Sequence, residues 1–280
     1  HCGVELGESW HKDPFTRRSA LKRMKQELLR RFSYLGLWDP TDDQDLATIS
    51  GVYGAYPVPH FFGIPLRYYP DRWPELDPTV RLSVAEIEQL DAQTVLNSPM
   101  MEELFEQMEL IEGEWGTIHG YLNWQGVLNN AFNIRGQEIF LDLADRPAFV
   151  HAFFDLITEV MIAFASRVQE RQRASGYSIN QFSVSNCVVN MISPEDYRTF
   201  VMPRDARFAA HFERYGVHTC NWDVTPYIEA LAELPPLGYL DMGLVSDMAA
   251  VRETFPDTRR AVIYSPWRLQ QAPLEEVRAD

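Results

Sequence analysis

From about residue 115 onward, short apolar segments alternate with longer amphipathic ones along this chain. Apolar runs of this length favour β-strands, and apolar residues at helical spacing favour α-helices. Strands that alternate with helices pair in parallel through helical crossovers, which leaves few possible folds. The expected strands are 116–123, 181–187, 217–221, 238–241 and 261–265.

Polar residues follow or end these strands: Asn123, Asn186, His218 with Cys220, Asp241 and Ser265. A (β/α)8 barrel keeps its active site at this end of its strands. A doubly wound sheet is the alternative, but no glycine-rich phosphate-binding turn follows any strand. We therefore predict an α/β chain with a TIM barrel whose eighth strand lies beyond Asp280. Residues 1–50 are expected to form an N-terminal helical region and residues 51–280 a single barrel domain.

Capping signals predict the main helices. Asp13-Pro14 opens a basic amphipathic helix to about Tyr34, and Ser83 to Glu86 forms a capping box. A long helix is expected from Asp145-Arg146-Pro147 to about Ala174. The proline- and aromatic-rich segment 51–78 is expected to hold loops and short extended pieces, because its prolines exclude a continuous helix.

Composition excludes several classes of function. The 280 residues carry a net charge of −15, which argues against nucleic acid or an anionic membrane surface as a partner. No apolar run is expected to reach the length of a transmembrane helix. Three scattered cysteines are too few for a disulfide framework, so a cytoplasmic protein is expected.

The pair His218 and Cys220 is the main candidate for a metal site. Residues two apart in a strand project to the same face, so an imidazole and a thiol would point together. This donor pair suits zinc. Core packing is the alternative, since a histidine beside a buried cysteine is more often structural.

Other residues could complete this site. Asp241, Asn123 and Asn186 are candidate catalytic or substrate-orienting residues, although each could be a structural residue at a strand end. Cys187 is a possible third sulfur ligand or a core residue. Asp223 and Glu114 are candidate oxygen ligands or supports for a ligand, and solvated loop carboxylates are the alternative.

Four stretches together resemble the uroporphyrinogen decarboxylase superfamily, and the resemblance covers most of residues 51–280. A further segment, Ser265-Pro266 through Val277, is similar to the family's penultimate strand and following helix. The four stretches are Gly120–Asn123 with Ile134–Glu138, Leu141-Asp142 with Arg146-Pro147, Ile192–Tyr197 with Met202-Pro203, and Gly216–Cys220.

The resemblance implies an enzyme of the methyltransferase branch rather than the decarboxylase. The decarboxylase has an N-terminal arginine-rich loop for its acidic substrate, and no counterpart is visible in this chain. In the methyltransferase branch, zinc is held by a His-x-Cys pair and a later cysteine, which would fall after Asp280. Asn221-Trp222 stand where that family usually has glycine after the pair.

That branch transfers methyl groups between a corrinoid protein and a thiol or other small acceptor, so cobalamin is expected only through a partner protein. An exposed aromatic rim is then expected for docking, formed by Tyr56, Phe61, Phe62, Trp124 and Trp222. A decarboxylase acting on a tetrapyrrole or small carboxylate, and a non-catalytic binding member of the superfamily, are the alternatives.

Overall fold

The computed structural model describes residues 2–36, 39 and 41–279. His1 and Asp280 lie outside the described residues. The chain forms two compact units. The first comprises His1–Arg81, Leu90–Asn123 and Ala163–Ile179, and the second Leu82–Gln89, Trp124–Ile162 and Asn180–Asp280.

The first unit is mainly helical. Helix α2 starts as predicted, because the Asp13 side chain accepts hydrogen bonds from the backbone N–H groups of Phe15 and Thr16. The proline-rich segment contains the expected extended pieces, paired antiparallel, and a short helix that was not expected. The elements are α1 (Glu8–Lys12), α2 (Pro14–Phe32), 3₁₀ turns (Ser33–Leu35, Gln44–Leu46), α3 (Pro57–Phe61), β1 (Leu66–Arg67), β2 (Glu75–Leu76), α5 (Ala92–Leu96) and α6 (Pro99–Trp115).

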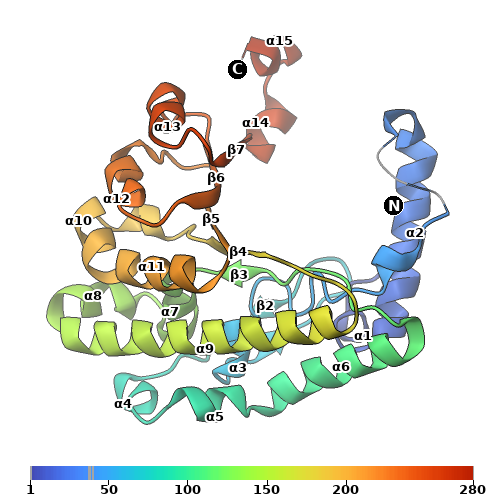
Figure 1. Ribbon diagram of the computed structural model, residues 1–280, viewed down its shortest axis with the longest axis horizontal. Helices are drawn as coiled ribbons and strands as arrows, with labels where there is room; N and C mark the ends of the chain where they lie inside the picture. Colours follow the sequence, from blue (N-terminus) through green and yellow to red (C-terminus); the bar gives the residue numbers. More distant parts are fainter. Residues whose placement is uncertain (1, 37–38, 40, 280) are drawn as a thin grey trace. The chain divides into compact units, whose positions relative to one another are not determined.

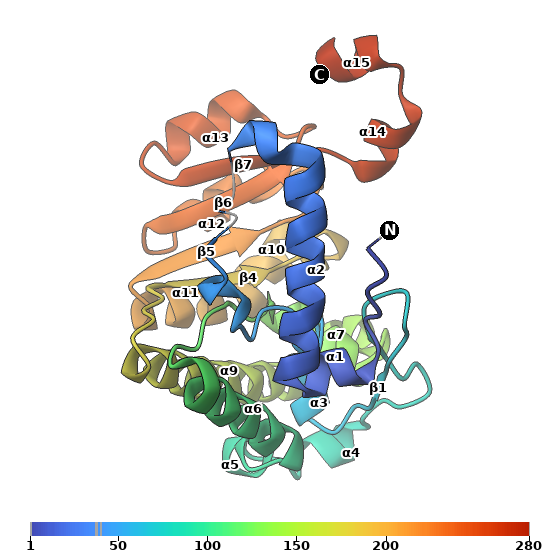
Figure 2. The same cartoon turned by 90° about the vertical axis from the view of Figure 1, so that its right-hand side faces the viewer.

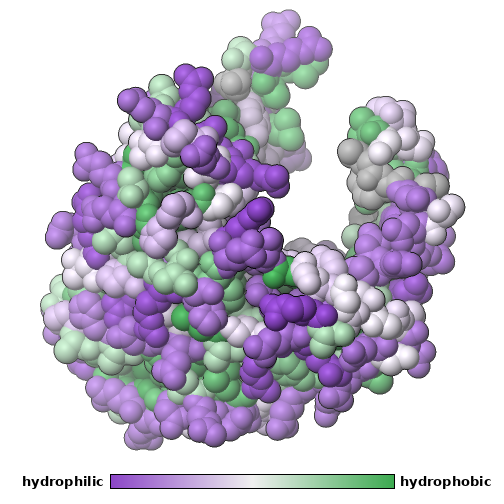
Figure 3. Space-filling view, in the orientation of Figure 1, coloured by the Kyte–Doolittle hydropathy of each residue, from purple (hydrophilic) through white to green (hydrophobic). Residues whose placement is uncertain are grey.

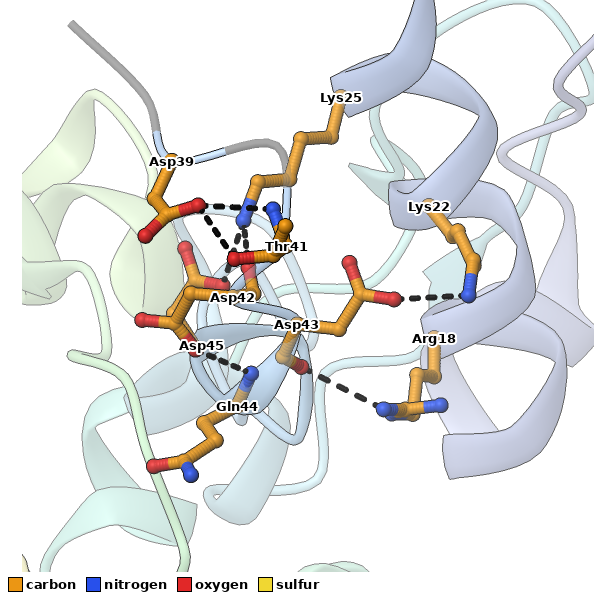
Figure 4. A network of polar contacts seen from close by, with 9 residues as sticks. All are labelled: Arg18, Lys22, Lys25, Asp39, Thr41, Asp42, Asp43, Gln44 and Asp45. Atoms are coloured by element: carbon orange, nitrogen blue, oxygen red, sulfur yellow. Dashed lines mark hydrogen bonds and ion pairs between the residues drawn. The ribbon is translucent and has the colours of Figure 1, made fainter.

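The basic residues of α2 hold the acidic segment that follows the helix (Figure 4). Lys22 pairs with the Asp43 carboxylate at 2.7 Å, and Lys25 pairs with Asp45 at 3.3 Å. Lys25 also donates a hydrogen bond to the backbone carbonyl of Asp42. These lysines are thus engaged by the chain's own carboxylates.

The second unit contains a parallel sheet in the order β3-β4-β5-β6-β7. Strand order follows chain order without a reversal, so these strands show no switch point of a doubly wound sheet. Helices α10 to α13 lie along one face of this sheet (Figures 1 and 2). The strands are β3 (Trp124–Gln125), β4 (Gln181–Ser185), β5 (Arg214–His218), β6 (Leu237–Gly243) and β7 (Arg259–Ile263).

The helices of the second unit follow the predicted alternation with several extra short pieces. Ser83 and Ser193 each open a helix with a capping box, since the side chain of the third helical residue returns to the serine backbone. The remaining elements are α4 (Val84–Ile87), α7 (Val127–Arg135), α8 (Glu138–Asp145), a 3₁₀ turn (Val189–Met191), α10 (Pro194–Asp196), a π-helix (Tyr197–Val201), α11 (Met202–His211), a 3₁₀ turn (Thr225–Tyr227), α12 (Ile228–Ala232), α13 (Met248–Thr254), α14 (Pro266–Gln271) and α15 (Leu274–Ala279).

Most predicted strands differ in their boundaries. Strand β4 ends at Ser185 rather than at residue 187, and β7 covers Arg259–Ile263 rather than 261–265. Segment 116–123 forms only a parallel bridge between His119 and Thr48, and the strand proper begins afterwards at Trp124. The strand predicted at 217–221 starts earlier and ends at His218. Cys220 lies beyond it with a φ of +59°, in the left-handed region that non-glycine residues seldom occupy.

Helix α9 (Pro147–Ala174) contributes its first part to the second unit and its last part to the first. It is long and apolar enough to cross a membrane, so the expectation of no such run is wrong. Core helices of globular proteins pass the same test, and more than half of the apolar window is buried. Its exposed positions carry Asp155, Glu159, Arg167 and Glu170, and Figure 3 shows hydrophilic residues along its visible side. Such a charged stripe opposite an apolar one is the pattern of a core helix.

A buried carboxylate, Asp205 on α11, supports the end of β4. Asp205 is fully buried and accepts hydrogen bonds from the hydroxyls of Tyr197 (2.9 Å) and Tyr215 (2.8 Å). The side-chain amide of Asn186 donates a third, at 3.0 Å. Burial raises the pKa of Asp205 to about 6, although these donors favour its charged form. The network fixes Asn186 directly after β4.

Gly243 at the end of β6 accommodates the loop that follows β5. A Cβ atom there would lie 2.1 Å from the backbone oxygen of Asn221 and 3.0 Å from that of Trp222. The Gly243 N–H donates to the same Trp222 oxygen at 3.0 Å. Only glycine therefore lets this loop lie against the strand.

The substitution Gly243→Ala should destabilise the protein by about 1–3 kcal/mol or more, because the added methyl group collides with backbone atoms. Urea unfolding measures the change in free energy. The matched control is Gly113→Ala in α6, where nothing lies within 4 Å of the added methyl. It should stabilise by about 0.5–1 kcal/mol, since alanine favours helix more than glycine. Equal effects of the two substitutions would contradict this view of Gly243.

The buried Asp205 should make the stability fall as pH rises from about 4 to 6. In that window the unfolded chain has already lost the proton that the folded state retains, because its pKa rises from 3.8 to about 6. The full penalty, present above pH 6, is about 3 kcal/mol. Asp205→Asn should remove this slope in urea unfolding measured across pH. Glu229→Gln, at a side chain that is 92% exposed, serves as control and should leave the slope unchanged.

Candidate metal centre

Three side chains from neighbouring strand ends converge in the second unit. The Sγ atoms of Cys187 and Cys220 are 2.7 Å apart, and the His218 Nε2 atom lies 3.1 Å from the Cys220 Sγ. One ligating atom of each residue lies within 4.8 Å of the other two. All three side chains are half-buried, and both cysteines are free. The cluster therefore offers one imidazole nitrogen and two sulfurs to a single point.

The sheet register brings these residues together. Ser185, the last residue of β4, pairs with His218 at the end of β5, so Cys187 leaves the sheet beside the histidine. The Asn186 N–H donates to the His218 carbonyl at 2.8 Å and continues this pairing beyond β4. Cys220 reaches the cluster through its left-handed backbone rather than through strand alternation. The predicted convergence of His218 and Cys220 is confirmed, but the reason given for it is wrong.

Asp241 on β6 orients the histidine. One carboxylate oxygen, Oδ2, lies 2.5 Å from His218 Nδ1 and accepts a hydrogen bond from the Tyr239 hydroxyl at 2.9 Å. The other oxygen accepts from the Thr219 N–H at 2.7 Å. Because Nδ1 is held by a carboxylate, Nε2 is the ring nitrogen turned to the two sulfurs. A carboxylate behind a histidine is a common support for metal-binding imidazoles.

The charges of the cluster are strongly coupled. The Asp241 carboxylate first, and Cys187 next, raise the pKa of His218 to about 9. The hydrogen bond from Cys220, with a further one from His218, lowers the pKa of Cys187 to about 5 despite burial. The pKa of Cys220 is raised, because its sulfur lies beside that of Cys187 and is partly buried. The two sulfurs therefore do not ionise independently of each other.

This donor set fits a zinc ion. Zinc takes thiolate and imidazole ligands, and sites with two cysteines, one histidine and an open fourth position occur in enzymes. Cys187 was considered in the sequence only as a replacement ligand or a core residue. Cys187 lies two residues after β4, as Cys220 lies two residues after β5. This shared position is the signal that could have favoured Cys187 as a metal ligand.

The other predicted site residues lie elsewhere or have other partners. Asn186 is buried against Asp205, and its Oδ1 atom faces Gly126, where a Cβ would lie only 1.8 Å away. Asn123 belongs to the first unit and precedes β3, so the expectation that it ends a strand is wrong. Asp223 is exposed and accepts from the Thr225 N–H at 2.9 Å, as a turn-forming residue does. Glu114 is exposed near the end of α6.

The expected aromatic rim is wrong for most of its members. Phe61, Phe62 and Trp124 are buried in the cores of their units, with at most 5% of each residue exposed. Tyr56 and Trp222 are half-buried, and Trp222 packs edge-on against Tyr227 with ring centroids 5.1 Å apart. Phe61 and Phe62, the two buried rim candidates of the proline-rich segment, therefore serve packing rather than surface recognition.

Comparison with known proteins places the chain in a family. A methyltransferase from Methanosarcina mazei has a similar structure, with a TM-score of 0.67 over 98% of this chain and 77% of that chain. At 15% sequence identity, this likeness shows the fold alone. No curated protein sequence matches the chain. The family model of uroporphyrinogen decarboxylase (URO-D) matches residues 48–255, well over half of the sequence, and the chain therefore belongs to the URO-D family.

Proposed function

We propose that this protein is a zinc-dependent methyltransferase of the URO-D family. It would move a methyl group between a corrinoid protein and a thiol or other small acceptor. The observation that carries the proposal is the convergence of Cys187, His218 and Cys220 within 4.8 Å. The structural likeness to a methyltransferase from Methanosarcina mazei supports the branch.

Each residue of the cluster has a role in this proposal. His218 Nε2 and the sulfurs of Cys187 and Cys220 hold the metal, which leaves a fourth position for the acceptor. Bound zinc lowers the pKa of a coordinated thiol and so supplies a nucleophile at neutral pH. Asp241 holds the imidazole so that Nε2 points to the sulfurs. Asn186 positions Cys187 through its bond to Asp205.

The strand order supports a (β/α)8 barrel as the complete fold. Five strands pair in chain order with helices α10 to α13 on one face, and such a sheet forms part of a barrel wall. In the first unit, the bridge between Thr48 and His119 is parallel as well. We further propose that the barrel is closed and that the protein is cytoplasmic.

A decarboxylase without metal is the second candidate, and the family name favours it. A substrate with several carboxylates needs arginine or lysine side chains at its site. The contacts of the Cys187–His218–Cys220 cluster come instead from thiols, a carboxylate, a hydroxyl and an amide. A soft donor cluster of this kind has no evident use in a metal-free decarboxylase, so we favour the methyltransferase. A non-catalytic member would also lack a use for this cluster.

Zinc content tests the proposal directly. Wild-type protein should bind about one zinc ion per chain, and the double variant His218→Ala, Cys220→Ser should bind none tightly, because two of three ligands are lost. Cys187→Ser alone should weaken binding strongly if this cysteine is the third ligand. Elemental analysis after dialysis measures the metal, and Cys2→Ser is the matched control that should retain it. Equal zinc in wild type and double variant, or none in either, would refute the metal centre.

Replacing Asp241 tests whether its carboxylate supports His218 as a zinc ligand. Asp241→Asn should weaken zinc affinity by about 10–100-fold, the usual cost of losing a carboxylate behind a ligating histidine. Competition with a chromophoric chelator measures the affinity. Asp223→Asn, in the exposed turn after Cys220, should leave it unchanged. An affinity unaffected by Asp241→Asn would show that this carboxylate only supports the fold.

A further inference from the structure

The turn that carries Cys187 has a support on α7, the helix that follows β3. Asn129 lies in the first turn of α7 and is buried, with 3% of the residue exposed. We propose that Asn129 is a positioning residue that holds Cys187 in place as the third ligand of the metal centre. This inference rests on the proposed function, since it assigns a role toward the same centre to a residue outside the cluster.

The sheet brings the start of α7 beside this turn. Gln125, the last residue of β3, pairs with Ser185, the last residue of β4. The Gly126 N–H donates to the Ser185 carbonyl at 2.8 Å, and α7 begins directly afterwards at Val127. The first turn of α7 and the turn after β4 therefore follow two strand ends that are in register with each other.

Two hydrogen bonds fix the direction of the Asn129 side chain. Its Oδ1 atom accepts from the backbone N–H of Val188, the residue after Cys187, at 3.0 Å. A backbone N–H can only donate, so this contact identifies the oxygen of the amide. The Nδ2 atom donates to Gln125 Oε1 at 2.7 Å. An amide nitrogen carries two hydrogens, so a second one is left for another acceptor.

The Cys187 sulfur is that acceptor. Hydrogen bonds lower the pKa of Cys187 despite its burial, the largest from Cys220 and the next from His218. The Asn129 side chain adds a further hydrogen bond that acts in the same direction. A donor to the sulfur favours the thiolate, which is the form that binds a metal. Asn129 therefore holds the ligand at two points, through its sulfur and through the backbone N–H that follows it.

Asn130, the next residue of α7, is buried as well but has other partners. Its Nδ2 atom donates to the Gln125 carbonyl at 2.8 Å and lies 3.3 Å from the Met161 sulfur. These contacts join α7 to the end of β3 and to α9. The two neighbouring asparagines thus separate two roles, since Asn129 contacts the turn of Cys187 and Asn130 contacts the surrounding scaffold.

Cobalt substitution tests the role of Asn129 in the full chain. Co(II) bound to cysteine thiolates has a charge-transfer absorption that grows with the number of thiolates, and titration gives the affinity. Asn129→Leu removes both the donor and the acceptor, whereas Asn129→Asp keeps an acceptor for the Val188 N–H and removes the donor. Each should weaken cobalt binding about tenfold or more. Each should also lower the charge-transfer absorption at saturating cobalt towards that of Cys187→Ser.

The matched control is Asn130→Leu, which removes a buried amide from the same helical turn. It should leave cobalt affinity and spectrum unchanged even where it lowers the thermal stability. Thermal unfolding shows whether each variant is folded, and Asn129→Asp decides the matter if Asn129→Leu does not fold. Wild-type affinity and spectrum in the Asn129 variants, or equal losses in Asn130→Leu, would overturn this inference alone. Failure of the wild-type chain to bind cobalt would overturn the metal centre and this inference with it.

Discussion

The hydrogen bond between Asp241 and His218 is the interaction on which the candidate centre depends. It joins two adjacent strands and leaves Nε2 as the ring nitrogen that faces the sulfurs. The same carboxylate accepts the Thr219 N–H, so it also fixes the backbone that leads to Cys220. A single buried acid therefore sets the direction of both the imidazole and the loop with the second thiol. Its burial makes this effective, because hydrogen bonds to a charged group are stronger away from water.

Around this pair, local backbone features replace regular structure. Cys220 adopts a left-handed conformation, and Gly243 leaves room for the loop that follows it. On the other side, Asn186 extends the pairing of β4 and β5 by one residue, and Asp205 holds its side chain. A residue other than glycine in the left-handed conformation costs free energy. Such residues persist where the surroundings impose the conformation, often at functional sites. The cluster is thus built from irregular turns that are anchored to a regular sheet.

Much of the second unit could be predicted from the sequence, because alternating patterns and capping residues are local signals. The helix starts at Pro14, Val84 and Pro194 follow from their N-cap residues, and a proline at the first helical position marks the start at Pro147. The exact strand ends could not be predicted, because an apolar run does not specify where pairing with a neighbour stops. For this reason Cys220 was placed inside a strand and Asn123 at the end of one. The role of Cys187 depends on the register between β4 and β5, a long-range property that no single segment carries.

The position of Cys187 also bears on the ligand pattern that the resemblance to zinc methyltransferases implies. A His-x-Cys pair with a later cysteine gives three protein ligands and an open position, as does the cluster of Cys187, His218 and Cys220. Both sulfurs together with a later cysteine would give four ligands and close the site, as in structural zinc sites. A closed site could not bind a thiol acceptor. The proposed methyl transfer therefore requires Cys187 to take the place of the later cysteine as a ligand, not to add to it.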